Sequence, residues 1–169
     1  LFDEKYAQAF HALYGLKAVA LRYFNVFGPR QDPHSEYSAV IPLFISRILE
    51  GERPTIFGDG EQSRDFIYVG DVVRANLAAA ASAAAAGEAL NVASGMGTTV
   101  NGLLDAVNGA LGTKVEAVRT APRPGDILHS TADITKAGRL MGFAPSLSFT
   151  DGLRQTADWY KKRSLRNER

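Results

Sequence analysis

Apolar positions recur along the chain with two spacings, one typical of helices and one typical of strands. Phe2, Tyr6 and Phe10 lie four residues apart, which predicts an amphipathic helix over residues 1–14. The apolar, β-forming run at residues 17–24 predicts a strand buried on both faces. Helices and strands alternate along the rest of the chain, so we expect a layered α/β architecture. The further elements predicted in this way are helices at 40–50, 71–86, 99–111, 133–141 and 151–163, and strands at 54–57, 66–69, 89–93 and 114–119.

Capping and turn residues set the expected boundaries of these elements. Asp71, either Thr98 or Thr99, and Thr150 can each cap the start of a helix with a side-chain oxygen. The sequence Gly58-Asp59-Gly60 predicts a tight turn that joins the two strands on either side of it as a hairpin.

Composition narrows the class of protein but does not identify it. Hydrophobic residues make up 46% of the 169 positions and charged residues 22%, as in an ordinary soluble domain. Nineteen basic and 18 acidic residues leave a formal charge of +1, which gives no reason to expect a nucleic-acid or membrane partner. With no cysteine and three scattered histidines (His11, His34 and His129), we expect neither disulfides nor a metal site, and a reducing cytoplasmic location.

Two predicted loops hold candidate binding residues near the ends of strands. Asn25 follows the first predicted strand, and ligands in open α/β sheets bind beyond the carboxyl ends of strands; the alternative is an asparagine that only forms a turn. Arg64 follows the Gly-Asp-Gly turn, and its planar guanidinium matches a phosphate group with two parallel hydrogen bonds. The alternative for Arg64 is a surface ion pair with Asp65 or Glu61, worth about 0–1 kcal/mol.

A third loop, Arg123-Pro124-Gly125-Asp126, combines opposite charges on a stiff backbone. Asp126 can accept hydrogen bonds from a ribose diol, and Arg123 can bind a phosphate. An ordinary salt-bridged turn is the alternative. The turn at Gly58 to Gly60 lacks the glycine spacing and the strand-to-helix context of a dinucleotide-binding loop. The residues by themselves therefore predict an α/β domain with an anion-binding cleft and no catalytic set.

Taken in order, these loops resemble the extended short-chain dehydrogenase/reductase family, and within it the UDP-hexose 4-epimerases that accept N-acetylated sugars. The resemblance covers nearly the whole chain. It implies the carboxyl-terminal part of a Rossmann-like, doubly wound sheet together with a small mixed α/β substrate-binding domain. We expect the sheet part at about 1–30 and 71–95, and the substrate-binding part at about 31–70 and 96–169. The motifs that carry it are Leu21–Pro33, Ala39-Val40-Ile41-Pro42, Gly58-Asp59-Gly60 with Ser63-Arg64-Asp65-Phe66, Leu90-Asn91-Val92-Ala93, and Arg123-Pro124-Gly125-Asp126.

The resemblance also implies roles for matching residues. Arg64 and Arg123 would hold the diphosphate of a UDP-sugar, and Asp126 would bind the uridine ribose. Ser130 falls where such enzymes carry either a tyrosine or a small residue, and a small one leaves room for an acetamido group. The remaining implied contacts are Asn25 to the diphosphate or sugar, residues Ile41 to Phe44 with Thr55 and Phe57 to the uracil, and Phe24 and Val26 beside the nicotinamide of NAD.

The catalytic part of the family pattern falls outside this sequence. Aligned with the family, residues 1–16 follow directly after the lysine of a Tyr-x-x-x-Lys motif, in which the tyrosine moves the proton of the sugar O4 hydroxyl. We therefore expect a fragment that does not retain NAD and is inactive alone. The alternatives are a piece of a 4,6-dehydratase or UDP-uronate decarboxylase, or a noncatalytic nucleotide-sugar-binding or assembly module. Helix 1–14 and the exposed edge of strand 17–24 predict a homodimer or other self-association.

Overall fold

A computed structural model describes residues 2–33 and 39–167, so Leu1 and His34 lie outside the described residues. Within these ranges the helices are α1 (Phe2–Tyr14), α2 (Val40–Leu49), α3 (Val69–Ala81), the short 3-10 helix η1 (Ala83–Ala85), α4 (Val100–Leu111), α5 (Thr135–Met141) and α6 (Phe149–Asn167). The strands are β1 (Ala20–Tyr23), β2 (Asn25–Phe27), β3 (Thr55–Phe57), β4 (Ser63–Tyr68), β5 (Ala89–Val92), β6 (Gly97–Thr99), β7 (Val118–Thr120) and β8 (His129–Ser130).

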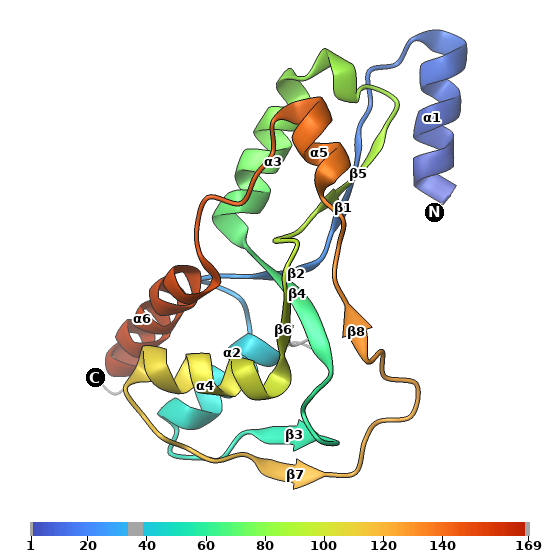
Figure 1. The fold of residues 1–169 in the computed structure, drawn as a ribbon. Helices are drawn as coiled ribbons and strands as arrows, with labels where there is room; N and C mark the ends of the chain where they lie inside the picture. Colours follow the sequence, from blue (N-terminus) through green and yellow to red (C-terminus); the bar gives the residue numbers. More distant parts are fainter. Residues whose placement is uncertain (1, 34–38, 168–169) are drawn as a thin grey trace.

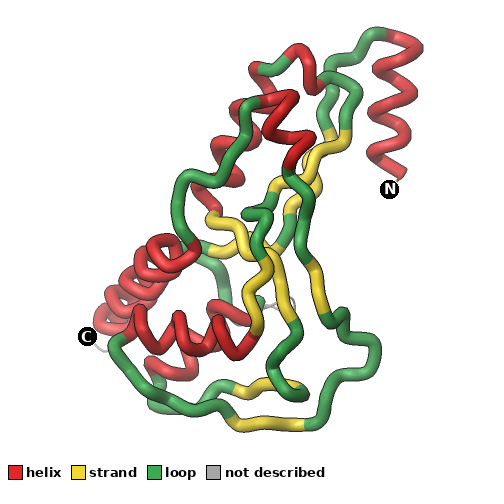
Figure 2. The backbone as a smooth tube through the Cα atoms, viewed as in Figure 1, coloured by secondary structure: helices red, strands yellow, loops and turns green. Residues whose placement is uncertain are grey.

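The elements form two groups joined by a central set of strands (Figures 1 and 2). Helices α1, α3 and α5 surround the β1–β5 pair in one group, and helices α2, α4 and α6 gather near the β3–β7 pair in the other. Strands β2, β4 and β6 lie between the two groups, and the two chain ends lie far apart in the views. The alternation of helices and strands therefore gave the correct architecture.

Parallel pairing dominates the sheets. β1 pairs with β5, β2 with β4, β3 with β7 and β4 with β8, all in parallel, whereas β6 pairs with β4 in the antiparallel direction. The predicted hairpin is wrong, because β3 and β4 belong to different sheets despite the turn between them. The turn keeps its glycine backbone, with φ of 74° at Gly58 and 80° at Gly60, but it redirects the chain from one sheet to another.

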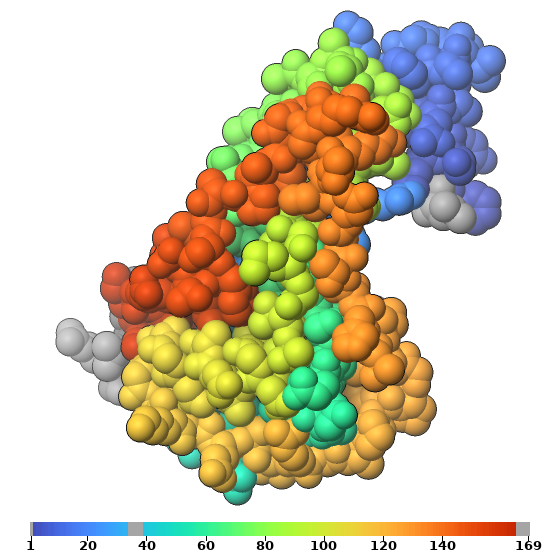
Figure 3. All heavy atoms as spheres, in the orientation of Figure 1, coloured from blue at the N-terminus to red at the C-terminus, as the bar shows by residue number. Residues whose placement is uncertain are grey.

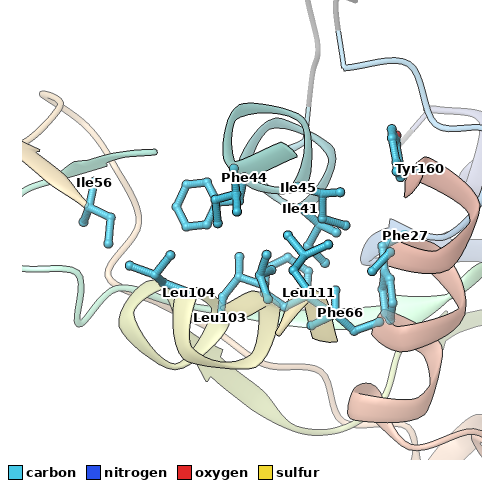
Figure 4. Packing of buried hydrophobic residues seen from close by; sticks show 14 residues of the cluster. Phe27, Ile41, Phe44, Ile45, Ile56, Phe66, Leu103, Leu104, Leu111 and Tyr160 are labelled. Atoms are coloured by element: carbon cyan, nitrogen blue, oxygen red, sulfur yellow. The ribbon is translucent and has the colours of Figure 1, made fainter. Parts of the chain in front are cut away.

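Two apolar clusters hold the groups together. In the first, Ile41 and Ile45 of α2 face Leu103 of α4, and Phe27 and Phe66 close the cluster near α6 (Figure 4). Fully burying side chains of this size stabilises a fold by roughly 1.5–3 kcal/mol each. The second cluster lies between α3, α5 and β5, and its buried members are Ile67, Val72, Ala75, Ala85, Leu90, Val92, Ala137 and Phe143.

The structure corrects two of the predicted helix caps. Thr99 caps α4 as expected, since its hydroxyl accepts a hydrogen bond from the Gly102 amide at 3.0 Å. Asp71 lies inside the first turn of α3 and caps nothing there. The last helix begins before Thr150, and the Ser148 hydroxyl accepts from the Asp151 amide at 3.1 Å. Each misplaced cap lies within two or three residues of the true start: Ser148 takes the capping role in α6, whereas no side chain caps α3, which starts after Tyr68.

The buried Asp71 connects α3 to a distant segment instead. Its carboxylate pairs with Arg74 and accepts hydrogen bonds from the Ser146 hydroxyl at 2.8 Å and the Ser146 amide at 3.2 Å. Burial by itself would raise the pKa of Asp71, but the hydrogen bonds from Arg74, Ser146 and the Leu147 amide lower it below its usual value. The carboxylate is therefore charged in the folded protein and fixes the segment that leads into α6.

The strand predicted at residues 17–24 is shorter and less buried than expected. β1 spans only residues 20–23, and its last two residues, Arg22 and Tyr23, are exposed. Within the described residues β1 pairs with β5 on one side only. An apolar run of this length indicates burial in a complete sheet, and here one edge and the carboxyl-terminal end of the strand remain open.

Helix α1 projects from the rest of the molecule (Figure 3). It has no buried residue, and Phe2, Tyr6 and Leu13 are 81%, 65% and 73% exposed. Polar contacts attach it: the Arg22 guanidinium donates two hydrogen bonds to the Glu4 carboxylate at 2.7 and 2.6 Å. The predicted amphipathic pattern is correct, but its apolar face lies toward solvent.

Candidate functional site

A cavity of about 370 Å³ lies between α2, β3, the start of β4 and the loop before β8. Its apolar wall comes from α2 and β3, and its polar wall comes from the loops on either side. The lining residues are Val40, Leu43, Phe44, Arg47, Thr55, Ile56, Phe57, Gln62, Arg64, Val100, Arg123 and Asp126. Arg64 of β4 thus borders one hollow together with Arg123 and Asp126, which come from a loop distant in sequence.

The parallel pairing of β3 and β7 brings the loop that holds Arg123 to the end of β3. Thr55 is opposite Val118, and Phe57 is opposite Thr120. The chain leaves β7 only three residues before Arg123, so this arginine emerges beside the end of β3. The Arg123 guanidinium lies over the Phe57 ring, 3.8 Å from its centre. A cation held over an aromatic face contributes about 0.5–2 kcal/mol, and here it also fixes where the charge points.

Arg64 is anchored from the opposite side of the cavity. Its guanidinium forms an ion pair with Asp126 and donates hydrogen bonds to the Ser63 carbonyl at 2.9 Å and the Ile127 carbonyl at 2.5 Å. The side chains of Arg64 and Asp126 are 21% and 35% exposed. The surface ion pair that the sequence left open, with Asp65 or Glu61, is not formed: Asp65 is fully buried and Glu61 binds Asn101. The cavity therefore has two cations and one carboxylate on its polar side.

Strand register places Ser130 beside Arg64. β8 runs parallel to β4 with Ser130 opposite Arg64, while the antiparallel β6 brings Thr98 opposite the same arginine. Residues opposite each other in neighbouring strands point to the same face of a sheet. Ser130 therefore shares a face with Arg64, although it does not border the cavity itself.

Four other predicted site residues lie outside this cavity. Ile41 is fully buried in the core cluster, and Val26 packs against the cluster beside β5. The Asn25 side-chain amide donates to the Asp65 carbonyl at 3.0 Å, and the Phe24 main-chain amide donates to the Val92 carbonyl at 3.1 Å. Phe44, Thr55 and Phe57, in contrast, border the cavity, and their contact with a uracil remains a prediction.

Two polar lining residues, Arg47 and Gln62, were not predicted from the sequence. Arg47 lies one helical turn after Phe44 and adds a third cation to the cavity border. It could have been predicted from its spacing, because residues three positions apart share a helix face. The Gln62 side chain donates to the Phe57 carbonyl at 2.9 Å and ties the turn to β3. Because the turn leads from β3 into a different sheet, no helix or strand periodicity predicts this contact.

The resemblance also implied a nicotinamide next to Phe24 and Val26, and that role remains a prediction. The Phe24 main-chain amide donates to the Val92 carbonyl, and the Val26 side chain packs among apolar neighbours. No group of three or more histidine or carboxylate side chains placed to share a metal ion occurs within residues 2–33 and 39–167. None of the helices in these ranges has the length and apolar character of a membrane span.

Parallel strand pairs flanked by helices on a layered sheet define a Rossmann-like α/β protein. The chain belongs to the NAD dependent epimerase/dehydratase family, whose model matches residues 1–93.

Relatives of known structure and sequence agree with this assignment. A UDP-N-acetylglucosamine 4-epimerase from Methanobrevibacter ruminantium M1, solved with UDP-N-acetylmuramic acid, is 48% identical with a TM-score of 0.88, over 95% of this chain and 51% of that one. A UDP-glucose 4-epimerase from Thermotoga maritima, solved with UDP-glucose, is 44% identical with a TM-score of 0.89, over 95% and 51%. A putative UDP-glucose 4-epimerase of Methanocaldococcus jannaschii is 40% identical over 94% of this chain and 50% of its own length.

The relatives also include other activities. A dTDP-glucose 4,6-dehydratase from Actinoplanes sp. is 33% identical over 92% of this chain and 47% of its own length. A UDP-N-acetyl-alpha-D-glucosaminuronate decarboxylase from Bacillus cytotoxicus is 31% identical over 90% and 49%. The chain spans about half the length of the curated relatives it matches.

Proposed function

We propose that this chain binds a UDP-sugar in the cavity bordered by Arg64, Arg123 and Asp126, as the substrate-binding part of an NAD-dependent UDP-sugar 4-epimerase. The observation that carries the proposal is that these three side chains border one hollow with the predicted uracil residues, although Arg64 and Arg123 lie 59 positions apart along the chain. Two guanidinium groups match the charge of a diphosphate, and hydrogen bonds to charged groups are worth about 1.5–3 kcal/mol each.

The lining supports an orientation for the nucleotide. Phe44, Thr55 and Phe57 provide the apolar and backbone surface that a uracil ring needs. Arg64 and Arg123 hold the diphosphate, and Asp126 accepts from the ribose hydroxyls while it keeps Arg64 aligned. The sugar then extends toward Ser130 and Asn25, which share the sheet face of Arg64.

The expected binding is measured by isothermal titration of the 169-residue chain with UDP-N-acetylglucosamine. We expect a one-to-one complex whose affinity for UDP is similar to that for the whole UDP-sugar, because the diphosphate and uridine contacts dominate. A folded chain that gives no UDP-dependent heat would exclude the proposed site.

We propose UDP-N-acetylhexosamine as the preferred sugar class, since Ser130 is small and leaves space where a tyrosine would crowd an acetamido group. The same titration with a Ser130→Tyr variant tests this preference. The substitution should weaken binding of UDP-N-acetylglucosamine at least fivefold and leave UDP within twofold. Equal affinity of both variants for the acetylated sugar nucleotide would contradict the preference.

Catalysis by this chain alone is not expected. The 169 residues contain no Tyr-x-x-x-Lys sequence, which supplies the proton-transfer group in the family resembled. Incubating the chain with NAD and UDP-N-acetylglucosamine should yield no 4-epimer. A 4-keto or decarboxylated product from a protein that also carries the catalytic motif would favour the dehydratase or decarboxylase alternative, which two of the relatives represent.

A further inference from the structure

A single buried carboxylate lies behind the polar wall of the cavity. Asp65 follows Arg64 in β4 and is fully buried. Because successive side chains of a strand point to opposite faces, Arg64 faces the cavity while Asp65 faces the other way. Asp65 thus cannot contact a ligand in the cavity, and neither the proposed function nor the family resemblance gives its side chain a role.

The Asp65 carboxylate accepts four hydrogen bonds from two separate segments. One oxygen accepts from the Ser94 amide at 2.7 Å and the Ser94 hydroxyl at 2.6 Å. The other accepts from the Gly95 amide at 3.0 Å and the Ala132 amide at 3.2 Å. The main-chain carbonyl of Asp65 accepts a fifth bond from the Asn25 side chain at 3.0 Å. One residue therefore joins β2, the turn before β6 and the segment after β8 to β4.

These segments are the ones that hold Arg64 in place. β6 and β8 both pair with β4 at residues 63–65, and the Ser63 amide donates to the Leu128 carbonyl at 2.7 Å. β8 is only two residues long, so its ladder offers little stability of its own. The bond to Ala132 fixes its far end, and its near end leads directly to Ile127 and Asp126, the partners of Arg64.

We propose that Asp65 is a positioning residue for the diphosphate site: its carboxylate locks β6 and β8 onto β4 and so fixes the direction of the Arg64 guanidinium. This inference rests on the proposed function, since it concerns affinity for the diphosphate. Its chemistry requires a carboxylate rather than an amide. All four side-chain bonds are accepted from donors, and an asparagine would turn its own N–H groups toward at least one of them.

The matched test compares Asp65→Asn with Asp71→Asn. Both aspartates are buried acceptors of several hydrogen bonds, but Asp71 lies on α3 and fastens Ser146, away from the cavity. With UDP as the probe, and at a temperature where circular dichroism shows each variant folded, Asp65→Asn should weaken affinity at least tenfold and Asp71→Asn less than twofold. Equal losses in the two variants, or an Asp65→Asn affinity within twofold of the unchanged chain, would overturn the proposal.

A double substitution separates positioning from a general structural effect. If Asp65 acts through Arg64, adding Asp65→Asn to Arg64→Ala should lower UDP affinity by less than a further twofold. A tenfold further loss in that background would overturn the proposal. Should Asp65→Asn fail to fold, Ser94→Ala removes one of the four donors and keeps the carboxylate; it should weaken UDP binding two- to fivefold, and an unchanged affinity would count against the role.

Hydrogen exchange tests the positioning role of Asp65 in the absence of a ligand. Loss of the Asp65 carboxylate should speed amide exchange at Ala132, Ser63 and Ser130, while amides of α3 keep their protection. Unchanged exchange at these positions would overturn the positioning role even in a chain that binds UDP. Faster exchange at these amides in a chain that never binds UDP would support the role of Asp65 in holding β6 and β8 on β4 and refute only the proposed function.

Discussion

Arg64 combines more interactions than any other described residue on the cavity border. It joins the Ser63 and Ile127 carbonyls with the Asp126 carboxylate, so a single side chain connects β4 to the loop before β8. Its planar fork leaves further N–H groups for a ligand, because a guanidinium has five donors. At the residue scale the site depends on this one cation more than on the wider lining.

Replacing Arg64 by alanine should lower UDP affinity about 10- to 100-fold, which corresponds to roughly 1.4–2.8 kcal/mol. The loss follows from removal of charge-assisted hydrogen bonds to the diphosphate and from release of Asp126. Calorimetric titration measures the change, with Arg154→Ala as the control. Arg154 forms an exposed ion pair on α6 with Asp151 and should leave the affinity unchanged. Equal affinity of the Arg64 variant and the control would contradict the assignment.

Asp71 provides a pH-dependent test of stability. Its pKa is lowered in the folded state, so the charged form stabilises the fold at pH values above the ordinary aspartate pKa of about 4. That contribution is lost as the pH falls through the lowered folded-state pKa. Asp71→Asn should therefore reduce the free energy of unfolding by about 2–4 kcal/mol at pH 7, and the difference from the unchanged chain should shrink below pH 4.

Urea unfolding between pH 7 and pH 2.5 checks this prediction. The control is Asp158→Asn, an exposed aspartate of α6, which should change stability little at neutral pH. A difference between the Asp71 variant and the unchanged chain that stays constant over this range would contradict the role of the charge.

The residue roles were partly predictable from the sequence. Arg64, Arg123 and Asp126 could be chosen as candidate binding residues because guanidinium groups bind phosphates and a carboxylate can bind a ribose diol. Their grouping followed from the order of the motifs, since no local pattern joins positions about 60 residues apart. The hydrogen bonds of Asp65 could not be predicted, because its partners, Ser94, Gly95 and Ala132, lie on segments that only the sheet register brings together.

Among the elements, helix α1 has no buried residue, so little of its surface packs against the rest of the chain. Its apolar stripe (Phe2, Tyr6, Phe10, Leu13 and Tyr14) is exposed, and the Glu4–Arg22 ion pair attaches its other side to β1. An exposed stripe of this kind marks an interaction site more often than a solvated surface. We propose that a second copy of the chain covers it.

Leu13→Glu should convert the resulting dimer to a monomer, because it introduces a charge into the apolar stripe. Sedimentation velocity at several concentrations measures the change. Ala12→Glu places the same charge on an exposed position away from the stripe and should leave the dimer intact. A monodisperse monomer for the unchanged chain would contradict the proposed self-association.

The turn between β3 and β4 offers a second test on an element. Gly60 has φ of 80°, and a Cβ atom there would lie 2.3 Å from the Asn101 side-chain oxygen. Gly60→Ala should therefore destabilise the fold by about 1–3 kcal/mol, measured by urea unfolding. Gly109→Ala, on the open face of α4 with nothing within 4 Å, should be neutral or slightly stabilising. Equal stability of the two variants would contradict the strained turn.

The elements themselves were largely predictable from periodicity. The helices at 40–50, 99–111 and 133–141 begin and end within two residues of the expected positions. The strands were less predictable: the hairpin failed because a glycine turn has the same local sequence whether the chain returns to its own sheet or enters another. The strand predicted at 114–119 begins only at Val118, since its earlier residues contact α4 rather than a neighbouring strand.

At the scale of the whole molecule, the two apolar clusters correspond to the two groups of elements. The predicted division, with sheet residues at 1–30 and 71–95, remains a proposal. Helix α5 was assigned to the substrate-binding part, and it packs against β5 and α3. Differential scanning calorimetry tests the division: Val72→Ala should lower one transition selectively if the groups unfold separately, and a single transition would argue for one cooperative unit.

An amide chemical-shift titration of the 169-residue chain with UDP tests binding in this cavity most sharply. We expect saturable shifts at Thr55 to Phe57, Gln62 to Arg64 and Arg123 to Ile127, the three segments around the cavity. A second hollow lies between α4 and residues 113–119; shifts confined to it, or no saturable shifts in a folded chain, would exclude the proposed site.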